Sequence, residues 1–272
     1  MTREFQFYIV PTPIGNIDDI TYRAVQILKD VDLIACEDTR VTQKLLNHYD
    51  IKTKCISYHK YNEKERVNFL ISELEKGNRI ALVSDAGTPM ICDPGNVIVQ
   101  ELLARGLTFT SLAGACAITT FLSEIPRNGE EFTFIGFIPR AEKQIEEVAL
   151  NYLSSNFVFY DSPERILKTL EIIKSCRGDI TIALGRELTK LFEEIKYGKI
   201  SEILEYFKDG IKGEIVCMIY AENNFEEKDV ESKINMLKEN GFKDKEIATI
   251  LATLFGYNKN KIYKQSMTSS NK

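Results

Sequence analysis

Acidic and imidazole side chains follow two strand-like segments of this 272-residue chain, at positions where they could act on a proton. Glu37 and Asp38 follow the apolar run DLIAC, and His59 follows KCISY. Because neighbouring parallel strands end at one edge of a sheet, these side chains can lie close together. They are candidates for a general base that draws a proton from a weak nucleophile. Helix capping by Asp38 and an ordinary, partly exposed His59 are the alternative interpretations.

Basic side chains accompany these acids. Arg40 follows shortly after Asp38, Lys60 follows His59, and Arg186 ends a later strand-like run, DITIALG. Each could bind a phosphate, although for Arg186 we favour an ion pair on a solvated surface. The net charge of −5 excludes a polycation, so any nucleic acid would have to bind at local basic patches.

The loop VPTPIGN at residues 10–16 follows the first predicted strand, where a nucleotide-binding protein would have a glycine-rich loop. Pro11 and Pro13 lack an N–H group and have a fixed φ angle, so they are unsuited to cradling a phosphate. The loop therefore argues against an NAD enzyme and a P-loop NTPase. It favours a binding site in which this loop forms a rigid wall. Prolines that only turn the chain are the alternative.

Two further loops with small residues follow strand-like runs. In VSDAGTPMICDPG, at 83–95, Asp85 stands beside Ala86 and Gly87, which suits a pocket for an ammonium, amide or hydroxyl group. Asp85 could instead only form the turn. SLAGACAITT, at 111–120, is a weak candidate alone. Together with VPTPIGN, these loops predict one composite site.

Cysteine and histidine usage predicts no metal site. The six cysteines are scattered without a CxxC pair, and there are two histidines, so buried free thiols in a reducing compartment are expected. The chain shows no signal-peptide pattern, and no apolar run approaches the roughly 18 residues of a membrane span. We therefore expect a soluble cytoplasmic protein without a membrane partner.

The first 115 residues alternate strand-length apolar runs with amphipathic segments, which predicts an α/β fold with a mostly parallel sheet. The expected helices start near Ile20, Thr39 and Asn62. Asp18 or Asp19 would cap the first of them. A later helix is expected to have Pro94 in its first turn and Gly106 just past its end.

Residues 116–224 contain five strand-like runs, several of them joined by short links. That pattern predicts a mixed sheet rather than a second parallel sheet. A polar, acidic linker then leads to 229–268, where three short helices are expected. We therefore divide the chain into an α/β domain at 1–115, a second α/β domain at 116–224 and a small helical module.

These motifs resemble the signature blocks of the ribosomal RNA small subunit methyltransferase I family, in the tetrapyrrole methylase superfamily. The similar blocks are, in order, YIVPTPIGNIDDITYRAVQILKDVDLIACEDTR, SYHKYNEKE, ALVSDAGTPMICDPG, FIGFIPR, FYDSPERI and RELTKLFEE. The resemblance spans residues 5–222, and the helical tail more weakly.

The resemblance implies two α/β domains with the cofactor in the cleft between them, and a homodimer. It also implies methyl transfer from S-adenosyl-L-methionine to the ribose 2′-hydroxyl of a cytidine in the decoding region of 16S rRNA, within the small ribosomal subunit. The cofactor-binding residues would be Pro13, Ile14, Asp85, Gly87, Thr88, Cys116, Ala117 and Tyr160.

The resemblance also suggests roles for the acidic, imidazole and basic side chains described above. Glu37, Asp38 or His59 would be the base or would orient the acceptor hydroxyl, while Arg40, Lys60 and Arg186 would hold RNA phosphates. The sequence departs from the family pattern at Pro11, where a small residue is usual. It departs again at residues 113–117, where AGACA stands in place of PGPSA.

The tail FKDKEIATILATLFGYNKNKIYKQSM resembles a helix-turn-helix module. Its last helix contains Lys259 and Lys261, which could meet the rRNA backbone. A helical cap that packs on the body is the alternative. For the whole chain, the rival interpretations are a methyltransferase of a tetrapyrrole-like small molecule and a non-catalytic rRNA-binding protein.

Overall fold

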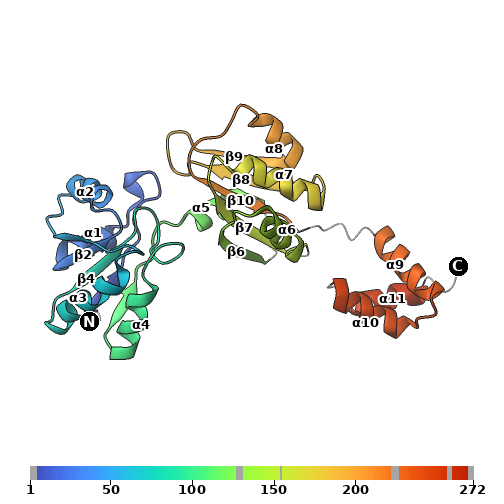
Figure 1. Cartoon of the computed structure of the whole chain (residues 1–272), viewed down its shortest axis with the longest axis horizontal. Coiled ribbons are helices and arrows are strands. Elements are labelled where there is room, and N and C mark those ends of the chain that lie inside the picture. Colours follow the sequence, from blue (N-terminus) through green and yellow to red (C-terminus); the bar gives the residue numbers. More distant parts are fainter. Residues whose placement is uncertain (1–4, 127–130, 154, 222–226, 256–258, 269–272) are drawn as a thin grey trace.

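The computed structural model describes residues 5–126, 131–153, 155–221, 227–255 and 259–268. Two five-stranded sheets, each with its own helices, lie beside one another, and three further helices follow at the end of the chain (Figure 1). The predicted architecture of two α/β halves and a helical module is therefore confirmed.

The first sheet is parallel throughout, with the strand order β3-β2-β4-β1-β5. Its strands are β1 (Phe7–Ile9), β2 (Leu33–Cys36), β3 (Cys55–Ser57), β4 (Ile80–Val83) and β5 (Phe109–Ser111). Its helical segments are η1 (Ile17–Asp19), α1 (Tyr22–Asp30), α2 (Thr39–His48), α3 (Glu63–Glu75) and α4 (Asn96–Arg105). Every residue of β1, β2 and β4 is buried, because two separate cores cover the two faces of the sheet. Polar side chains are therefore left to the loops at the strand ends.

The start of α1 differs from the sequence prediction. Thr21 caps this helix, since its hydroxyl oxygen accepts a backbone N–H of the first turn at 3.1 Å. Neither Asp18 nor Asp19 is the cap, because both belong to the preceding 3-10 turn η1. The Thr21 hydroxyl directly precedes the helix and can reach the N–H groups of its first turn, whereas the two carboxylates lie too early in the chain to be the N-cap.

The predicted boundaries of α4 are correct at one end and wrong at the other. Gly106 ends the helix in the left-handed conformation, at φ 66°, as expected. Pro94 lies before the helix rather than in its first turn, because Gly95, at φ 141°, interrupts the helical backbone between them.

The second sheet is mixed, as predicted, with the order β6-β7-β10-β8-β9 and one parallel pair, β6 with β7. Its strands are β6 (Phe132–Phe137), β7 (Asn156–Asp161), β8 (Thr181–Arg186), β9 (Glu194–Lys199) and β10 (Ile215–Ile219). The helices of this half are α5 (Ala117–Glu124), α6 (Glu142–Asn151), α7 (Ile166–Arg177) and α8 (Ile200–Tyr206). One face packs against α6, α7 and α8, while the other packs against α5 and receives Ile14 from the first half. The core that contains α5 and Ile14 therefore joins the two halves.

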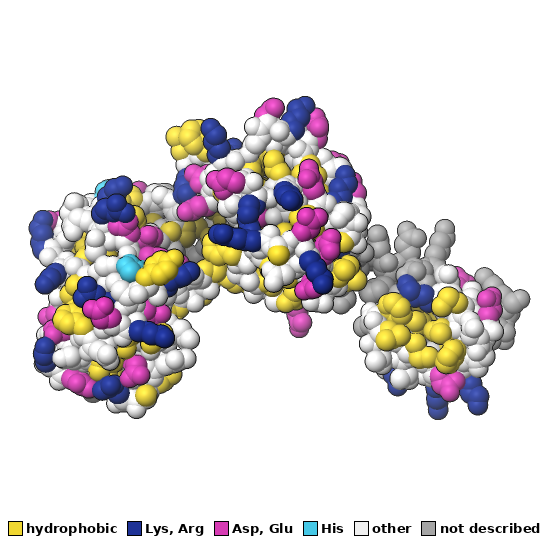
Figure 2. Space-filling view, viewed as in Figure 1, with side chains coloured by type: hydrophobic (Ala, Val, Ile, Leu, Met, Phe, Trp, Pro, Cys, Tyr) yellow, Lys and Arg dark blue, Asp and Glu magenta, His cyan; other side chains and the backbone are white. Residues whose placement is uncertain are grey.

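Helices α9 (Glu227–Glu239), α10 (Asp244–Phe255) and α11 (Lys259–Thr268) pack around a small core of their own and lie apart from both sheets (Figure 1). A cap that packs on the body is therefore not the observed arrangement. Hydrophobic side chains gather on the visible face of this module (Figure 2). Its exposed large hydrophobic residues are Met236, Phe242, Leu254, Phe255 and Met267. No helix in the described ranges is both long and apolar enough to cross a membrane.

Candidate functional site

A cavity of about 440 Å³ lies between loops of the two halves, within the range of about 300–1,000 Å³ that is common for small-molecule sites. Loops after β1, β4 and β5 supply one side, and β6, β7, β10 and the β8–β9 loop supply the other. The lining residues are Ile14, Asp85–Thr88, Ile91–Asp93, Cys116, Ala117, Phe137, Tyr160–Pro163, Leu188 and Gly213–Val216. The composite site predicted from the three strand-end loops thus corresponds to one cavity.

The family resemblance assigned eight residues to the cofactor, and the structure places seven of them in this wall. These seven are Ile14, Asp85, Gly87, Thr88, Cys116, Ala117 and Tyr160. Pro13 is half-buried but is not among the lining residues. Its neighbour Ile14 supplies the contact from this loop.

Hydrogen bonds tie the three loops of the first half together. Thr12 and Gly87 exchange two backbone N–H···O bonds of 2.9 Å, and the Thr12 hydroxyl donates to the carbonyl of Ser84 at 3.0 Å. The Thr88 hydroxyl donates to the carbonyl of Ala115 at 2.9 Å. Gly87 adopts φ +79°, and a Cβ there would lie 3.2 Å from the Ile14 Cγ2 atom. The loops therefore form one stiff wall with little space for larger side chains.

Pro11 packs against the third of these loops. Its side chain is buried, and a Cβ added to Gly114 would lie 2.6 Å from the Pro11 Cβ atom. The proline ring thus fills the space beside Gly114. This contact gives a physical role to the residue that departs from the family pattern, and it explains why residue 114 has no side chain.

Three carboxyl groups near the first sheet's edge have raised pKa values. Burial is the largest cause for Glu37, Asp85 and Asp93, and repulsion from a neighbouring carboxylate adds to it in each case: Asp93 and Asp85 act on Glu37, Asp38 acts on Asp85, and Asp85 acts on Asp93. Asp85 and Asp93 line the cavity, whereas Glu37 does not. Asp85 also accepts the backbone N–H of Asp38 at 3.0 Å, which links the cavity wall to the end of β2.

Asp38 is the N-cap of α2, as the alternative interpretation held. Its carboxylate accepts the backbone N–H of Arg40 at 2.8 Å and forms an ion pair with the Arg40 side chain at 2.6 Å. These contacts lower the pKa of Asp38 to about 2. Its carboxylate oxygens are thus already used by the helix and by Arg40, and they make a weak base.

His59 is half-buried beside the same edge. Its backbone N–H donates to the side chain of Asn62 at 2.8 Å, and its ring meets Tyr61 edge to face. The Nδ1 atom is buried and has no hydrogen-bond partner in the part of the chain that the structure describes. His59 does not line the cavity, but it is close enough to Glu37 to oppose the rise of the Glu37 pKa. The structure therefore brings His59 and Glu37 near one another.

The basic residues singled out in the sequence have different surroundings. The Arg40 side chain is 87% exposed despite its ion pair, and Lys60 is exposed with its ammonium over the Tyr61 ring. Arg186 forms an ion pair with Glu194 at 2.8 Å, as the favoured interpretation held, but the pair is half-buried rather than on a solvated surface. Lys259 is exposed on α11, and the side chain of Lys261 lies outside the described residues.

Aromatic rings form part of the second half's wall. The Tyr160 ring lies 5.5 Å from Phe137 and 5.2 Å from Phe134, measured between ring centroids. Burial raises the pKa of the Tyr160 hydroxyl, which keeps it protonated and able to donate a hydrogen bond. Phe137 is 63% exposed and reaches the cavity from the end of β6.

The sequence missed part of the second half's wall. Asp161–Pro163 and Phe137 lie inside the blocks FYDSPERI and FIGFIPR, so the motif signal was present but was not assigned to individual residues. Leu188 lies in RELTKLFEE in the same way. Gly213–Val216 belong to no recognised block, and only the sheet order brings them to the cavity.

Asp161 anchors the loop after β7. Its side chain is fully buried, forms an ion pair with Arg165 and accepts the Thr169 hydroxyl at 2.6 Å. Arg165 in turn donates to the carbonyl of Ile138 at 3.3 Å. This network fixes the Ser162–Pro163 segment against the cavity.

Comparison with known proteins adds to this geometry. The family model described as Tetrapyrrole (Corrin/Porphyrin) Methylases matches residues 6–204. A protein of Hydrogenobaculum sp. named ribosomal RNA small subunit methyltransferase I is 42% identical over 222 residues, covering 80% of this chain and 96% of that protein. A protein of the same name from Streptococcus pyogenes serotype M3 is 39% identical over 268 residues, covering 95% and 93%.

A solved structure shares the fold. Uroporphyrin-III C-methyltransferase from Thermus thermophilus, in complex with S-adenosylhomocysteine, aligns with a TM-score of 0.55 at 15% identity. The alignment covers 80% of this chain and 97% of that one. At this identity the likeness shows that the two chains share an arrangement of sheets and helices.

Proposed function

Because the chain belongs to the tetrapyrrole methylase family, and within it to the ribosomal RNA small subunit methyltransferase I group, we propose that it methylates the ribose 2′-hydroxyl of a cytidine in the decoding region of 16S rRNA. Family membership makes the chain an S-adenosylmethionine-dependent methyltransferase. The methylated atom and nucleotide are the proposal.

The observation that carries the proposal is a cavity walled by three tightly bonded strand-end loops, beside which Glu37 has a raised pKa. The residues present fit S-adenosylmethionine. Asp85 and Asp93 offer carboxylate oxygens for ammonium or hydroxyl groups, and Ile14, Leu188 and Tyr160 offer apolar surface. When bound, the cofactor supplies a methyl group on a sulfonium, from which it can pass to an oxygen by in-line displacement.

We assign the base for the acceptor hydroxyl to Glu37. A ribose hydroxyl is a poor nucleophile until its proton is withdrawn, and a carboxylate whose pKa is raised by burial accepts that proton more readily than an ordinary one. Asp38 is a weaker candidate for two reasons. Its pKa of about 2 makes its carboxylate a poor proton acceptor, and its oxygens already accept hydrogen bonds from Arg40 and the start of the helix. His59, whose Nδ1 atom has no hydrogen-bond partner among the described residues, would orient Glu37 or the acceptor.

The surface that we propose for RNA phosphates includes Arg40 and Lys60 at the edge of the first sheet, and Lys259 on α11. Arg186 is the weakest member of the original set, because Glu194 already pairs with it. The target cytidine would have to leave its stack to reach a cavity between the two halves. We expect the acceptor to be the small ribosomal subunit and the enzyme to act as a homodimer.

Labelled-methyl transfer tests the proposal. The enzyme is offered unmethylated small ribosomal subunits, naked 16S rRNA and a uroporphyrin-type tetrapyrrole, and the product RNA is hydrolysed in alkali. We expect label in the rRNA, at one cytidine whose 3′ phosphodiester resists alkali because the 2′-oxygen is blocked. Label in the tetrapyrrole alone would support the rival small-molecule activity, and failure to bind S-adenosylmethionine would support a non-catalytic RNA-binding protein.

The role of the helical module is tested separately. A chain truncated before residue 229 should retain methyl donor binding but lose transfer to small subunits, because the module would no longer hold the RNA. Unchanged transfer by this truncated chain would contradict RNA docking by α9–α11.

A further inference from the structure

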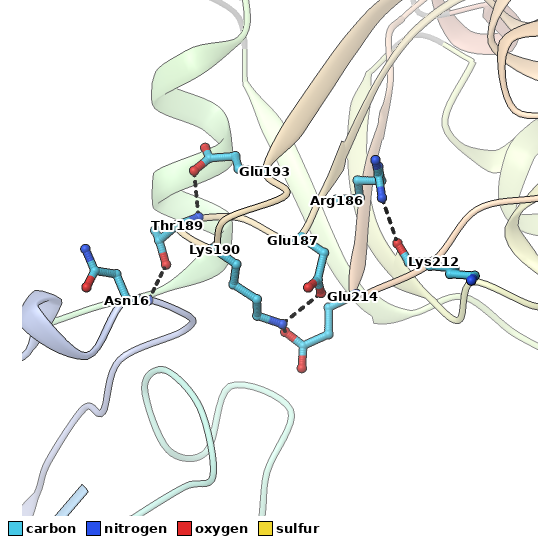
Figure 3. Close-up of polar contacts among 8 residues, drawn as sticks. All are labelled: Asn16, Arg186, Glu187, Thr189, Lys190, Glu193, Lys212 and Glu214. Atoms are coloured by element: carbon cyan, nitrogen blue, oxygen red, sulfur yellow. Dashed lines mark hydrogen bonds and ion pairs between the residues drawn. The ribbon is translucent and has the colours of Figure 1, made fainter. Parts of the chain in front are cut away.

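The loop between β8 and β9 contacts the PTPIGN loop of the first half (Figure 3). The Thr189 hydroxyl oxygen accepts the backbone N–H of Asn16 at 3.0 Å. The two backbones also approach closely at Gly15. A Cβ added there would lie 2.5 Å from the Lys190 Cγ atom and 2.7 Å from the carbonyl oxygen of Leu188. We call the contact between residues 15–16 and 188–190 the clasp.

The clasp lies directly beside the cofactor cavity. Ile14 precedes it on one loop and Leu188 begins it on the other; both side chains are buried, belong to one hydrophobic core and line the cavity. The position of the clasp therefore sets the distance between an apolar side chain of the first half and one of the second.

The backbone of the β8–β9 loop is strained where it forms the clasp. Glu187 has φ 51° and Thr189 has φ 63°, a left-handed conformation that residues with a side chain rarely adopt and that a β-branched residue such as threonine adopts least. Strain of this kind persists only where the surroundings hold it, and it concentrates at functional sites.

Charged side chains hold this strained loop in place (Figure 3). The Glu187 carboxylate accepts the Lys190 ammonium at 2.8 Å and the backbone N–H of Glu214 at 3.0 Å. The backbone N–H of Thr189 donates to the Glu193 carboxylate at 2.8 Å. The loop is therefore fixed from both sides of Thr189.

The same network fixes a further part of the cavity wall. Gly213 and Glu214 line the cavity, and a Cβ added to Gly213 would lie 2.3 Å from the Glu187 Cγ atom. Lys190 also donates to the Glu214 carboxylate at 3.2 Å. Glu187 thus connects the clasp with the turn that leads into β10.

We propose that Thr189 is a positioning residue for the cofactor pocket: its hydroxyl holds the PTPIGN loop at the spacing from Leu188 that the bound methyl donor requires. The proposal rests on the proposed function, since it takes S-adenosylmethionine as the occupant. Thr189 acts through Ile14 and Leu188 and does not itself line the cavity.

The first experiment measures binding of S-adenosylmethionine to the full-length protein by titration calorimetry. Thr189→Val removes the acceptor oxygen at nearly constant volume and should weaken binding about two- to tenfold, the range for the net contribution of one hydrogen bond. Thr189→Ser keeps the oxygen and should restore affinity. Thr110→Val, the same change on β5 outside the clasp and the cavity lining, should bind like the wild type.

A second variant enlarges the effect by steric means. Gly15→Ala inserts a methyl group against the backbone carbonyl of Leu188 and should weaken binding more than about tenfold, since neither loop has room to accept it. Gly198→Ala is the matched control, because its methyl group meets only the movable end of the Glu202 side chain. In methyl transfer, both clasp variants should raise KM for S-adenosylmethionine while kcat at saturating donor stays within about twofold.

The outcomes separate the two proposals. If the wild-type protein binds S-adenosylmethionine and both Thr189→Val and Gly15→Ala bind it with the same affinity, the positioning role of Thr189 is overturned and the proposed function stands. A fall in kcat without a rise in KM would also overturn it, because the clasp would then act on the chemical step. A wild-type protein that does not bind S-adenosylmethionine would overturn the proposed function itself.

Discussion

The two halves of the chain treat the charged groups near the cavity in opposite ways. At the edge of the first sheet, burial raises the pKa of Glu37, Asp85 and Asp93; Asp38 is the exception there, because Arg40 stabilises its carboxylate. In the second half, the hydrogen bond from Lys190 lowers the pKa of Glu187. The pKa of Glu194 is lowered as well, because hydrogen bonds from Tyr206 and Arg186 outweigh its burial.

This difference separates groups that hold the structure from groups available for ligands. A carboxylate with a lowered pKa has partners that stabilise its charge, so it contributes to folding and is not free to react. A buried carboxylate with a raised pKa has too few partners to offset the loss of solvation, and natural proteins tolerate that cost mostly at functional sites. The contrast places chemistry at the edge of the first sheet and support in the second half.

The largest effect is expected from Glu37→Gln. If Glu37 withdraws the acceptor proton, the single-turnover rate of methyl transfer should fall at least about 100-fold, the lower range for a general base. Binding of S-adenosylmethionine should not change. Glu75→Gln, on the exposed surface of α3, is the matched control. A rate within twofold of the wild type would remove Glu37 from the role and leave His59 as the candidate.

The next effect concerns stability. Glu187→Gln replaces a carboxylate that accepts Lys190 at 2.8 Å and is 21% exposed, so the free energy of unfolding should fall by about 1.5–3 kcal/mol at pH 7. Glu205→Gln is the control, since the exposed Glu205–Lys208 pair should contribute less than about 1 kcal/mol. Urea unfolding measures both; equal losses in the two variants would contradict the supporting role of Glu187.

The pH dependence of this loss has a definite sign. The folded pKa of Glu187 is lowered, so its contribution is fully present above the unfolded pKa of about 4.5 and is lost as the pH falls through the folded value. The difference between wild type and Glu187→Gln should therefore be constant from neutral pH down to about 5 and shrink below it. A difference that grows on acidification would show that Glu187 is not stabilised as a carboxylate.

The sequence predicted those parts of the fold and site that follow from one strand and the loop after it. In a parallel sheet every such loop lies at the carboxyl edge, so VPTPIGN, VSDAGTP and AGACA could be placed together without coordinates. Gly213–Val216 could not be placed, because β10 lies between β7 and β8 and no local pattern shows that order. The roles of Asp38 as cap and as base were equally compatible with its sequence context, and only its contacts with Arg40 distinguish them.

A pH-rate profile gives a further test of the first sheet's edge. Glu37 must be deprotonated to act as a base, and its pKa is raised above the ordinary 4.5, so the rate should begin to fall at a pH above 4.5 as the solution is acidified. Below the apparent pKa the loss should be about tenfold per pH unit, and Glu37→Gln should lack this limb. A limb that persists in the variant would belong to another group.

The smallest effect is expected at Lys60, which lies at the same edge but is exposed. If its ammonium contacts one RNA phosphate, Lys60→Ala should weaken RNA binding about two- to fivefold near physiological salt and make the slope of log K against log salt shallower by about one. Methyl donor binding should stay unchanged, because Lys60 does not line the cavity. Lys52→Ala is the control: this exposed lysine pairs with Asp50 and precedes β3, so it lies toward the opposite edge of the sheet. An equal change of slope in both variants would mean that the RNA responds to the net charge of the first half, and that its carboxyl edge has no special affinity for phosphate.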